Sequence, residues 1–455
     1  MNGVKAFHYI RGVNDEMKKS MIRWITAVLA LILTAGCGAG GTGGSGSGNA
    51  DPGKETLTFW MKKQMFEEQN QMIQERAKQF GEEHNVNVNV EFIAYEDFYP
   101  KWSAAIESGT TPDVSFFGYQ EVGQFYAKEV LEDVTDLVGK VEKANGEIQD
   151  SLKASVTFED KLYGVPLWTE STALYYRKDM LQAAGFSEPP ATWEEFREMA
   201  KALTDPSKGI YGAGLGYGKG NSDAEWLTRA IIWSHGGSLD TEDGKTVVVN
   251  TPETLQAVQL IRDIFIEDKV TPPSSIGWDD SGNNKSYLSG QSAMIFNVGS
   301  LAATIKNDNP ELYENTGIAM LPAGPKGAVV PGISNNLGIF KASKNKDLAK
   351  SFIEYMTDKT WYGTWVENGA PLTGPIYKDL ATEAVWQEEK NKGFVDSIAH
   401  FAFLGYPGVY NPKAGEIYNL RYVNDVFQKM LLDSGFTAQQ AVEELQSKIE
   451  AVYGK

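Results

Sequence analysis

Cysteine and histidine are both scarce in this chain of 455 residues. The only cysteine is Cys37, so no intramolecular disulfide can form and no thiol nucleophile lies beyond the N-terminal leader. The four histidines are too widely spaced in the sequence to predict a zinc site. We therefore expect no metal site and no cofactor.

Basic residues are also fewer than acidic residues. Lys and Arg number 42 against 60 Asp and Glu, which gives a formal net charge of −18. Because binding to phosphates needs a surplus of Lys and Arg, nucleic acid is not an expected partner. Hydrophobic residues make up 42% and aromatic residues 11%, which is typical of a globular chain with room for two or three domains.

The apolar run at residues 24–33 is too short for a membrane-spanning helix. Lys18, Lys19 and Arg23 precede it and small residues follow it, so residues 1–36 are interpreted as a secretory signal peptide. Residues 1–16 have no leader character, which makes Met17 an alternative start.

The segment from Leu33 to Cys37 resembles the lipobox of bacterial lipoproteins, in which the cysteine becomes the acylated first residue. The alternative is an ordinary signal peptide with an incidental cysteine. Residues 37–54 are rich in Gly and Ser and are expected to form a flexible tether. Together these features predict a body that is lipid-anchored at the extracytoplasmic face of the cell membrane.

Strand and helix patterns alternate after the tether. The pattern predicts strands at 57–60, 86–92 and 114–117, and helices at 66–80 and 98–108. This alternation indicates an α/β domain with a largely parallel sheet, in which ligands gather at the loops after the strands. Those loops begin at Trp60 and at Phe117.

Further along, Thr192 and Glu195 form a predicted capping box. Helices are expected at 224–235, 252–267 and 345–356, and strands at 317–321 and 333–340. The alternating glycines from Gly212 to Gly220 lack the spacing of a nucleotide-binding loop. They indicate instead a strand or loop that another backbone approaches closely.

The stretch from Leu162 to Met180 contains the most informative pattern. A β-prone run follows a Gly/Pro break, and Trp168 and Glu170 place an aromatic ring beside a carboxylate. One interpretation is a buried central strand in which a nearby cation pairs with Glu170. The other is a strand that crosses between two lobes and carries these groups into a cleft.

This stretch resembles the first inter-lobe crossing of the sugar-binding receptors of bacterial ABC importers, the maltose-binding-protein-like solute-binding family. The matching residues are Lys161, Leu162, Pro166, Glu170, Leu174, Tyr176, Lys178 and Asp179. Further similar motifs are Thr111-Pro112-Asp113, Thr192-Trp193-Glu194-Glu195 and Ala293-Met294. The resemblance covers nearly all of residues 57–452 and is weak at 376–425.

The resemblance implies a two-lobed α/β fold of the periplasmic-binding-protein type II class. It implies crossings near 166–172, 321–326 and 370–375. Lobe 1 would comprise 55–168 and 325–372, and lobe 2 would comprise 169–320 and 375–455. It also implies a monomeric, non-enzymatic receptor that serves the transmembrane subunits of an ABC permease with a cytoplasmic ATPase.

Several ligand-binding positions follow from the resemblance. Glu170 matches a ligand-bonding glutamate, and Phe117 and Trp226 fall where aromatic rings stack on sugar, although Trp226 could also be a core residue of its helix. Gln120, Glu121 and Ser300 depart from the maltose-type pattern. Tyr418 replaces another stacking tryptophan of that pattern. The remaining candidates rest on loop position and chemistry: Trp60, Tyr119, Trp168, Trp278, Asn283, Asn297 and Asn335.

Aromatic faces and short polar groups are what sugar recognition requires. We therefore expect a carbohydrate ligand. A binding surface of this kind is expected to accommodate a short oligosaccharide of about two to five sugar units. Two alternatives stay open. One is a surface-tethered glycan hydrolase or lyase, although paired carboxylates such as Asp279-Asp280 are best explained as solvated surface. The other is a receptor of the same fold for a peptide, a polyamine or iron.

Overall fold

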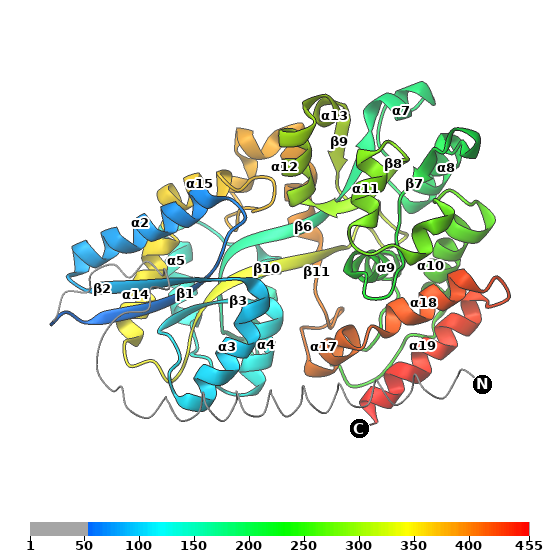
Figure 1. Ribbon diagram of the computed structural model, residues 1–455. Coiled ribbons are helices and arrows are strands. Elements are labelled where there is room, and N and C mark those ends of the chain that lie inside the picture. Colours follow the sequence, from blue (N-terminus) through cyan, green and yellow to red (C-terminus); the bar gives the residue numbers. More distant parts are fainter. Residues whose placement is uncertain (1–52, 455) are drawn as a thin grey trace, which may run out of the picture. The chain divides into compact units, whose positions relative to one another are not determined.

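The computed structural model describes residues 53–454 (Figure 1). The predicted signal peptide, the alternative start at Met17, Cys37 and the tether up to residue 52 lie outside these residues. The described residues fall in a single compact unit. None of their helices is both long and apolar enough to cross a bilayer.

The first lobe is built around three parallel strands. β1 (Thr56–Lys62) lies between β2 (Asn87–Ile93) and β3 (Val114–Gly118). α2 (Glu67–His84), α3 (Tyr95–Ser108) and α4 (Tyr119–Ala127) connect or follow them. The alternation predicted from the sequence is confirmed, and the predicted ends agree with the observed ones to within four residues, the largest difference being at the C-terminal end of α2.

Two long antiparallel strands pass between the lobes. β6 (Val165–Arg177) pairs first with β10 (Val330–Ile339) and then with β8 (Ser292–Val298) and β9 (Thr316–Ala319). β10 also pairs with β3 of the first lobe. These strands therefore belong to one continuous mixed sheet, with β7 (Tyr211–Ala213) at its far end and β11 (Phe401–Ala402) beside β10.

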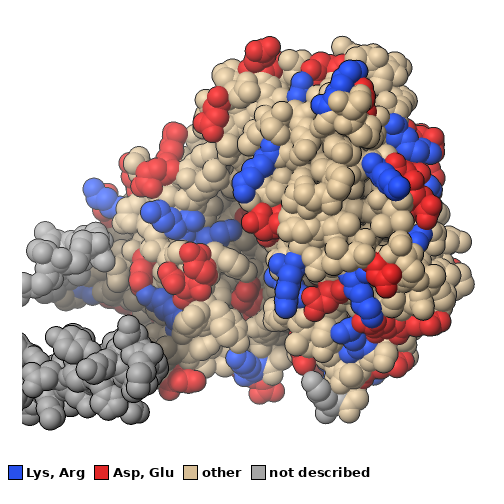
Figure 2. Space-filling view, turned by 45° about the vertical axis from the view of Figure 1, so that its right-hand side comes forward, with Lys and Arg blue, Asp and Glu red and all other residues tan. Residues whose placement is uncertain are grey.

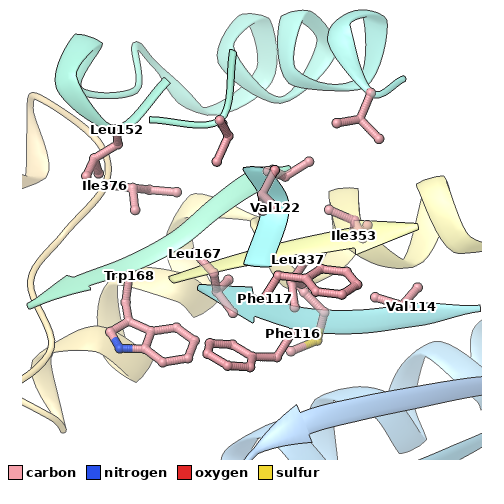
Figure 3. Packing of buried hydrophobic residues seen from close by; sticks show 14 of the residues in the cluster. Val114, Phe116, Phe117, Val122, Leu152, Leu167, Trp168, Leu337, Ile353 and Ile376 are labelled. Carbon is pink, nitrogen blue, oxygen red and sulfur yellow. The ribbon is translucent and has the colours of Figure 1, made fainter. Parts of the chain in front are cut away.

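The change of lobe can be located from the two main hydrophobic cores. Leu167 and Trp168 of β6 are buried in the first core, shown in Figure 3, whereas Leu174 belongs to the second. On β10, Val330 lies in the second core and Leu337 in the first. The first crossing thus agrees with the expected one, whereas the second lies at residues 331–336, after the 321–326 segment expected from the resemblance.

The C-terminal region contributes to both cores. Ile376, Tyr377 and Trp386 are buried in the first core, whereas Ala402 and the buried residues from Ile417 onward belong to the second. The resemblance implies instead that 375–455 belongs to the second lobe as a whole. The difference arises because aromatic side chains such as Tyr377, whose ring meets that of Tyr362 edge-on at 5.3 Å, fill the first core.

Further short elements of the first lobe are α5 (Thr135–Asn145), α6 (Asp150–Ala154), β4 (Thr157–Phe158), β5 (Lys161–Leu162), α14 (Lys346–Met356) and α15 (Lys359–Glu367). The other helices are α7 (Lys178–Ala183), α8 (Trp193–Leu203), α9 (Ser222–His235), α10 (Pro252–Arg262), α11 (Gly282–Leu288), α12 (Gly299–Asp308), α13 (Pro310–Asn315), α16 (Glu389–Asp396), α17 (Pro412–Asn419), α18 (Tyr422–Leu432) and α19 (Ala438–Tyr453).

Two local predictions are confirmed by contacts. The hydroxyl of Thr192 accepts a hydrogen bond from the backbone N–H of Glu195 at 3.1 Å and so caps α8, whereas the Glu195 carboxylate accepts the backbone N–H of Ala191 at 2.7 Å, so only the N-cap half of the predicted box forms. A Cβ atom added at Gly212 would lie 2.0 Å from the carbonyl oxygen of Ala200, so the glycine run does meet another backbone closely. On the face shown in Figure 2, acidic and basic side chains are interspersed over the surface.

Candidate functional site

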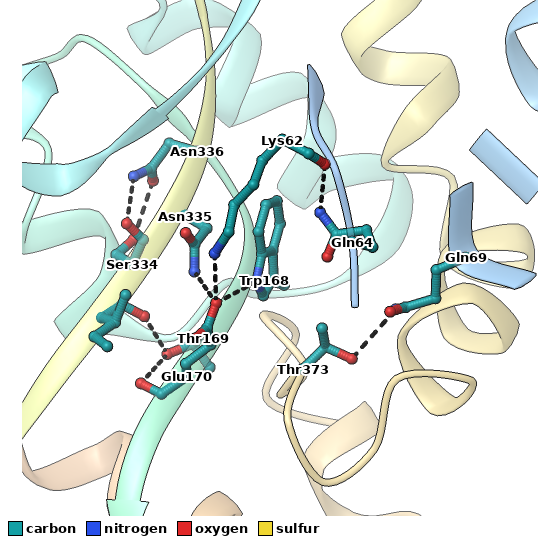
Figure 4. Close-up of polar contacts among 11 residues, drawn as sticks. Lys62, Gln64, Gln69, Trp168, Thr169, Glu170, Ser334, Asn335, Asn336 and Thr373 are labelled. Atoms are coloured by element: carbon teal, nitrogen blue, oxygen red, sulfur yellow. Dashed lines mark hydrogen bonds and ion pairs between the residues drawn. The ribbon is translucent and has the colours of Figure 1, made fainter. Parts of the chain in front are cut away.

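Glu170 is the centre of a polar cluster on the crossing strand β6 (Figure 4). Its Oε1 atom accepts hydrogen bonds from Lys62 Nζ at 3.1 Å, from Trp168 Nε1 at 3.1 Å and from Asn335 Nδ2 at 3.3 Å. Trp168 and Glu170 lie two residues apart on one face of β6, and Asn335 is the β10 partner of Trp168. Pairing of the two crossing strands therefore assembles this cluster.

The second carboxylate oxygen of Glu170 is available. Within residues 53–454, no group donates a hydrogen bond to Oε2, and the side chain is 14% exposed. The three donors on Oε1 fix the orientation of the carboxylate. Glu170 thus presents a positioned acceptor at the point where the two lobes meet.

Lys62 reaches this carboxylate from the C-terminal end of β1. Its Nζ lies 5.5 Å from the ring centres of Tyr95 and Trp168 and 5.8 Å from that of Phe116. The aromatic faces and the carboxylate together compensate an ammonium group whose side chain is 23% exposed. Lys62 is therefore held in place beside Glu170.

Aromatic rings that are half-buried or exposed lie on both lobes. In the second lobe, the rings of Trp226 on α9 and Tyr418 on α17 lie 5.1 Å apart, and the guanidinium of Arg421 lies 4.5 Å above Tyr418. Trp226 also packs against the first core. In the first lobe, Tyr95 is 50% exposed, and its hydroxyl group donates to Glu121 Oε1 at 3.3 Å.

The structure brings together Trp168, Glu170 and Asn335 of the predicted set, and places Trp226 beside Tyr418. Glu121 is nearly buried, and this burial raises the pKa of its carboxyl group. Tyr119 is buried and accepts a weak hydrogen bond from the backbone N–H of Leu404 at 3.4 Å, while Gln120 is half-buried.

The prediction that Phe117 offers a ring face to a ligand is wrong. Its side chain is 0% exposed and stacks on Trp102 at 5.1 Å inside the first core (Figure 3). The reason is that β3 is covered on both faces, so all its residues are buried. Trp168 is also fully buried, so it can orient Glu170 but offers no exposed ring.

Trp60 lies on β1 with Lys101 Nζ 4.5 Å above its ring, and it packs against the first core. Trp278 is half-buried next to the glycine run, and a Cβ added at Gly282 would lie 2.4 Å from that of Trp278. Ser300 is half-buried in the first turn of α12. None of these three touches the Glu170 cluster through a hydrogen bond among the described residues.

Asn283 and Asn297 are both 6% exposed. Asn283 Nδ2 donates to Asp223 Oδ2 at 2.9 Å and to the carbonyl oxygen of Phe296 at 3.0 Å. Asn297 Nδ2 donates to Asn284 Oδ1. These two predicted residues therefore support their neighbours in the second lobe.

Lys62, Tyr95 and Asp223 were not among the predicted site residues. Lys62 directly follows the hydrophobic part of the first strand, and Tyr95 follows the second strand, so the rule that ligands gather after parallel strands would have identified both. Asp223 lies one helical turn before Trp226, which is the signal that would have pointed to it. Within residues 53–454, no group of three or more His, Cys, Asp or Glu side chains could hold a metal ion.

Known proteins share both the sequence pattern and this architecture. A binding protein from Brucella abortus is 26% identical over 68% of this chain and 73% of its own length. The diacetylchitobiose binding protein of Streptomyces coelicolor is 24% identical over 78% of this chain and 81% of its own. An ABC transporter solute-binding protein from Thermotoga lettingae, solved with α-D-tagatose, superposes with a TM-score of 0.70 at 24% identity, over 88% of this chain and all of that one. The family model described as bacterial extracellular solute-binding protein matches residues 66–363, and the chain belongs to that family.

Proposed function

We propose that this protein binds a carbohydrate, a short oligosaccharide, between its two lobes and delivers it to an ABC permease. The observation that carries the proposal is the Glu170 carboxylate, fixed by Lys62, Trp168 and Asn335 with one oxygen still available. A fixed acceptor together with partly exposed aromatic rings on both lobes suits a sugar, because sugar hydroxyl groups donate to the carboxylate while the C–H faces of the sugar stack on aromatic side chains.

Relatives supply independent support for a sugar. One relative is named for diacetylchitobiose, another for arabinooligosaccharide, and a solved neighbour holds α-D-tagatose. The family and these neighbours are binding proteins, which is why we assign no catalytic residue. The pairs of carboxylates considered in the sequence are therefore treated as surface.

Anchoring and delivery complete the proposal. Acylation of Cys37 would hold the protein at the extracytoplasmic face of the membrane, and the Gly/Ser-rich tether would let a monomeric body reach the transmembrane subunits of the permease. The two lobes would close over the ligand by rotation about the crossing strands β6 and β10.

A ligand screen tests the proposal. The protein is titrated calorimetrically with cellotriose, maltotriose, mannotriose, galactotriose and N,N′-diacetylchitobiose, and with a peptide, a polyamine and ferric citrate as non-sugar solutes. We expect saturable binding of at least one sugar together with a smaller radius of gyration in X-ray scattering. Binding of only a non-sugar solute, or release of reducing ends from a sugar, would refute it.

A further inference from the structure

A chain of side-chain hydrogen bonds lies in the second lobe outside the Glu170 cluster. We call it the amide ladder; it consists of Asp223, Asn283, Asn284 and Asn297. Asn283 Nδ2 donates to Asp223 Oδ2 at 2.9 Å, the backbone N–H of Asn284 donates to Asn283 Oδ1 at 2.8 Å, and Asn297 Nδ2 donates to Asn284 Oδ1. Three separate elements, α9, α11 and β8, are thereby linked.

Both ends of the ladder lie where the two lobes meet. At one end, Asp223 is three residues before Trp226, and such a spacing places two side chains on the same face of α9. At the other end, Asn297 Oδ1 accepts the backbone N–H of Val298 at 2.9 Å, and Val298 pairs with Thr172 on the crossing strand. The ladder therefore extends along the side of the second lobe that faces the first.

The four residues of the amide ladder differ in burial and in which polar atoms have no hydrogen-bond partner. Asn283 and Asn297 are buried, whereas Asp223 and Asn284 are half-buried. Among residues 53–454, no side chain or backbone group bonds to Asp223 Oδ1 or to Asn284 Nδ2. The ladder thus holds one acceptor and one donor in place and leaves both for a ligand.

The charges around Asp223 restrict the ligand. The Asp280 carboxylate accepts the backbone N–H of Ser222 at 2.7 Å and that of Asp223 at 3.2 Å, and Asn221 accepts that of Ala224 at 2.8 Å. The first three residues of α9 therefore have their N–H groups already paired. The carboxylates of Asp223 and Asp280 lie at this helix end, and that of Glu225 is paired with Arg229. The nearby Lys285 is engaged with Ser281 at 2.7 Å. A carboxylate on the ligand would be repelled here.

We propose that the amide ladder is the hydroxyl-binding wall of the second lobe, where Asp223 Oδ1 and Asn284 Nδ2 bind neighbouring hydroxyls of an uncharged or amino sugar unit beside Trp226. A hydroxyl group both donates and accepts, so an adjacent pair satisfies one acceptor and one donor at once. The inference rests on the proposed function and adds that uronic acids are excluded. It also assigns the contacts to Asp223 and Asn284, with Asn283 and Asn297 as positioning residues.

Burial and the Asp280 carboxylate raise the pKa of Asp223 to about 7, so the test is run at about pH 8.5, where this carboxyl group is charged. It titrates wild type and two variants with the five sugars of the screen and with trigalacturonate as the acidic probe. Asp223→Asn should weaken the best neutral sugar about 10- to 100-fold, and Asn284→Ala about fivefold, because a charged acceptor and a neutral donor are lost respectively. Asp308→Asn and Asn307→Ala, exposed residues of α12 with the same chemical changes, should stay within about twofold of wild type.

Selectivity separates direct contact from a structural effect. Wild type should bind galactotriose or another neutral sugar and not trigalacturonate. Asp223→Asn should reduce the difference in affinity between the neutral sugar and trigalacturonate, whereas general disruption of the fold would weaken the binding of both ligands alike. Unchanged affinity in both variants, or wild-type binding of trigalacturonate comparable to that of the best neutral sugar, would overturn the amide-ladder proposal alone. Failure of every sugar to bind would overturn the proposed function and this inference together.

Discussion

Glu170→Ala is the substitution whose effect on stability can be worked out most fully from the structure. It removes the only acceptor that Lys62 Nζ, Trp168 Nε1 and Asn335 Nδ2 share. Lys62 keeps partial access to water, so the ammonium can be partly rehydrated, whereas the indole N–H of Trp168 is buried. Loss of one half-buried ion pair and stranding of a buried donor should lower the free energy of unfolding by about 2–3 kcal/mol.

The assay is urea unfolding followed by tryptophan fluorescence, since Trp168 lies within the perturbed cluster. Glu170→Gln serves as the matched variant, because it keeps an oxygen acceptor and the volume while removing the charge, and it should cost about 1 kcal/mol. A double-mutant cycle with Lys62→Met measures the coupling directly, which should be about 1–2 kcal/mol. A Glu170→Ala protein as stable as wild type, or a coupling indistinguishable from zero, would refute the account of this cluster.

Three further outcomes are expected. Phe117→Ala should lower the free energy of unfolding by about 3–5 kcal/mol in the same assay, because it leaves a cavity in the first core, and it should leave sugar affinity in the folded protein unchanged; a loss of affinity without a loss of stability would place the ring at the ligand after all. Burial and the Asp280 carboxylate raise the pKa of Asp223 to about 7. Between about pH 4 and about pH 7, the folded protein therefore keeps a proton on this carboxyl group that the unfolded chain has lost. The stability that this group contributes is present below about pH 4 and is lost as the pH rises through about 7. Asp223→Asn should remove that part of the pH dependence in urea titrations, and an unchanged profile would contradict the assignment. Cys37→Ala should release the protein from the detergent phase in a phase-partition experiment, and wild type that is already fully in the aqueous phase would count against a lipid anchor.

The crossing strand could be predicted because its information is local. The succession of Pro166, Trp168, Glu170 and Leu174 contains a turn signal, a strand period and a family motif within one segment, and the structure places the lobe change between Trp168 and Leu174. The same holds for the capped helix at Thr192, where the hydrogen bond joins residues three apart.

The parts that could not be predicted depend on contacts between distant segments. Phe117 follows the same pattern as a site residue, and only the packing of Trp102 and Phe340 against it shows that the ring is enclosed. Lys62 becomes a partner of Glu170 because the fold brings together two residues that are 108 positions apart in the chain. The assignment of Tyr377 and Trp386 to the first core likewise arises from tertiary packing, in a region where the resemblance was weakest.

The most direct test of the central claim is isothermal titration of Glu170→Gln and Trp226→Ala with the sugar that binds wild type best. These residues approach from the crossing strand and from the second lobe, so a ligand held between the lobes must depend on both. We expect each variant to bind about 10- to 100-fold more weakly, and Trp361→Ala, a half-buried tryptophan on α15, to bind as wild type does. Wild-type affinity in both Glu170→Gln and Trp226→Ala would contradict a binding site at the crossing of the two lobes.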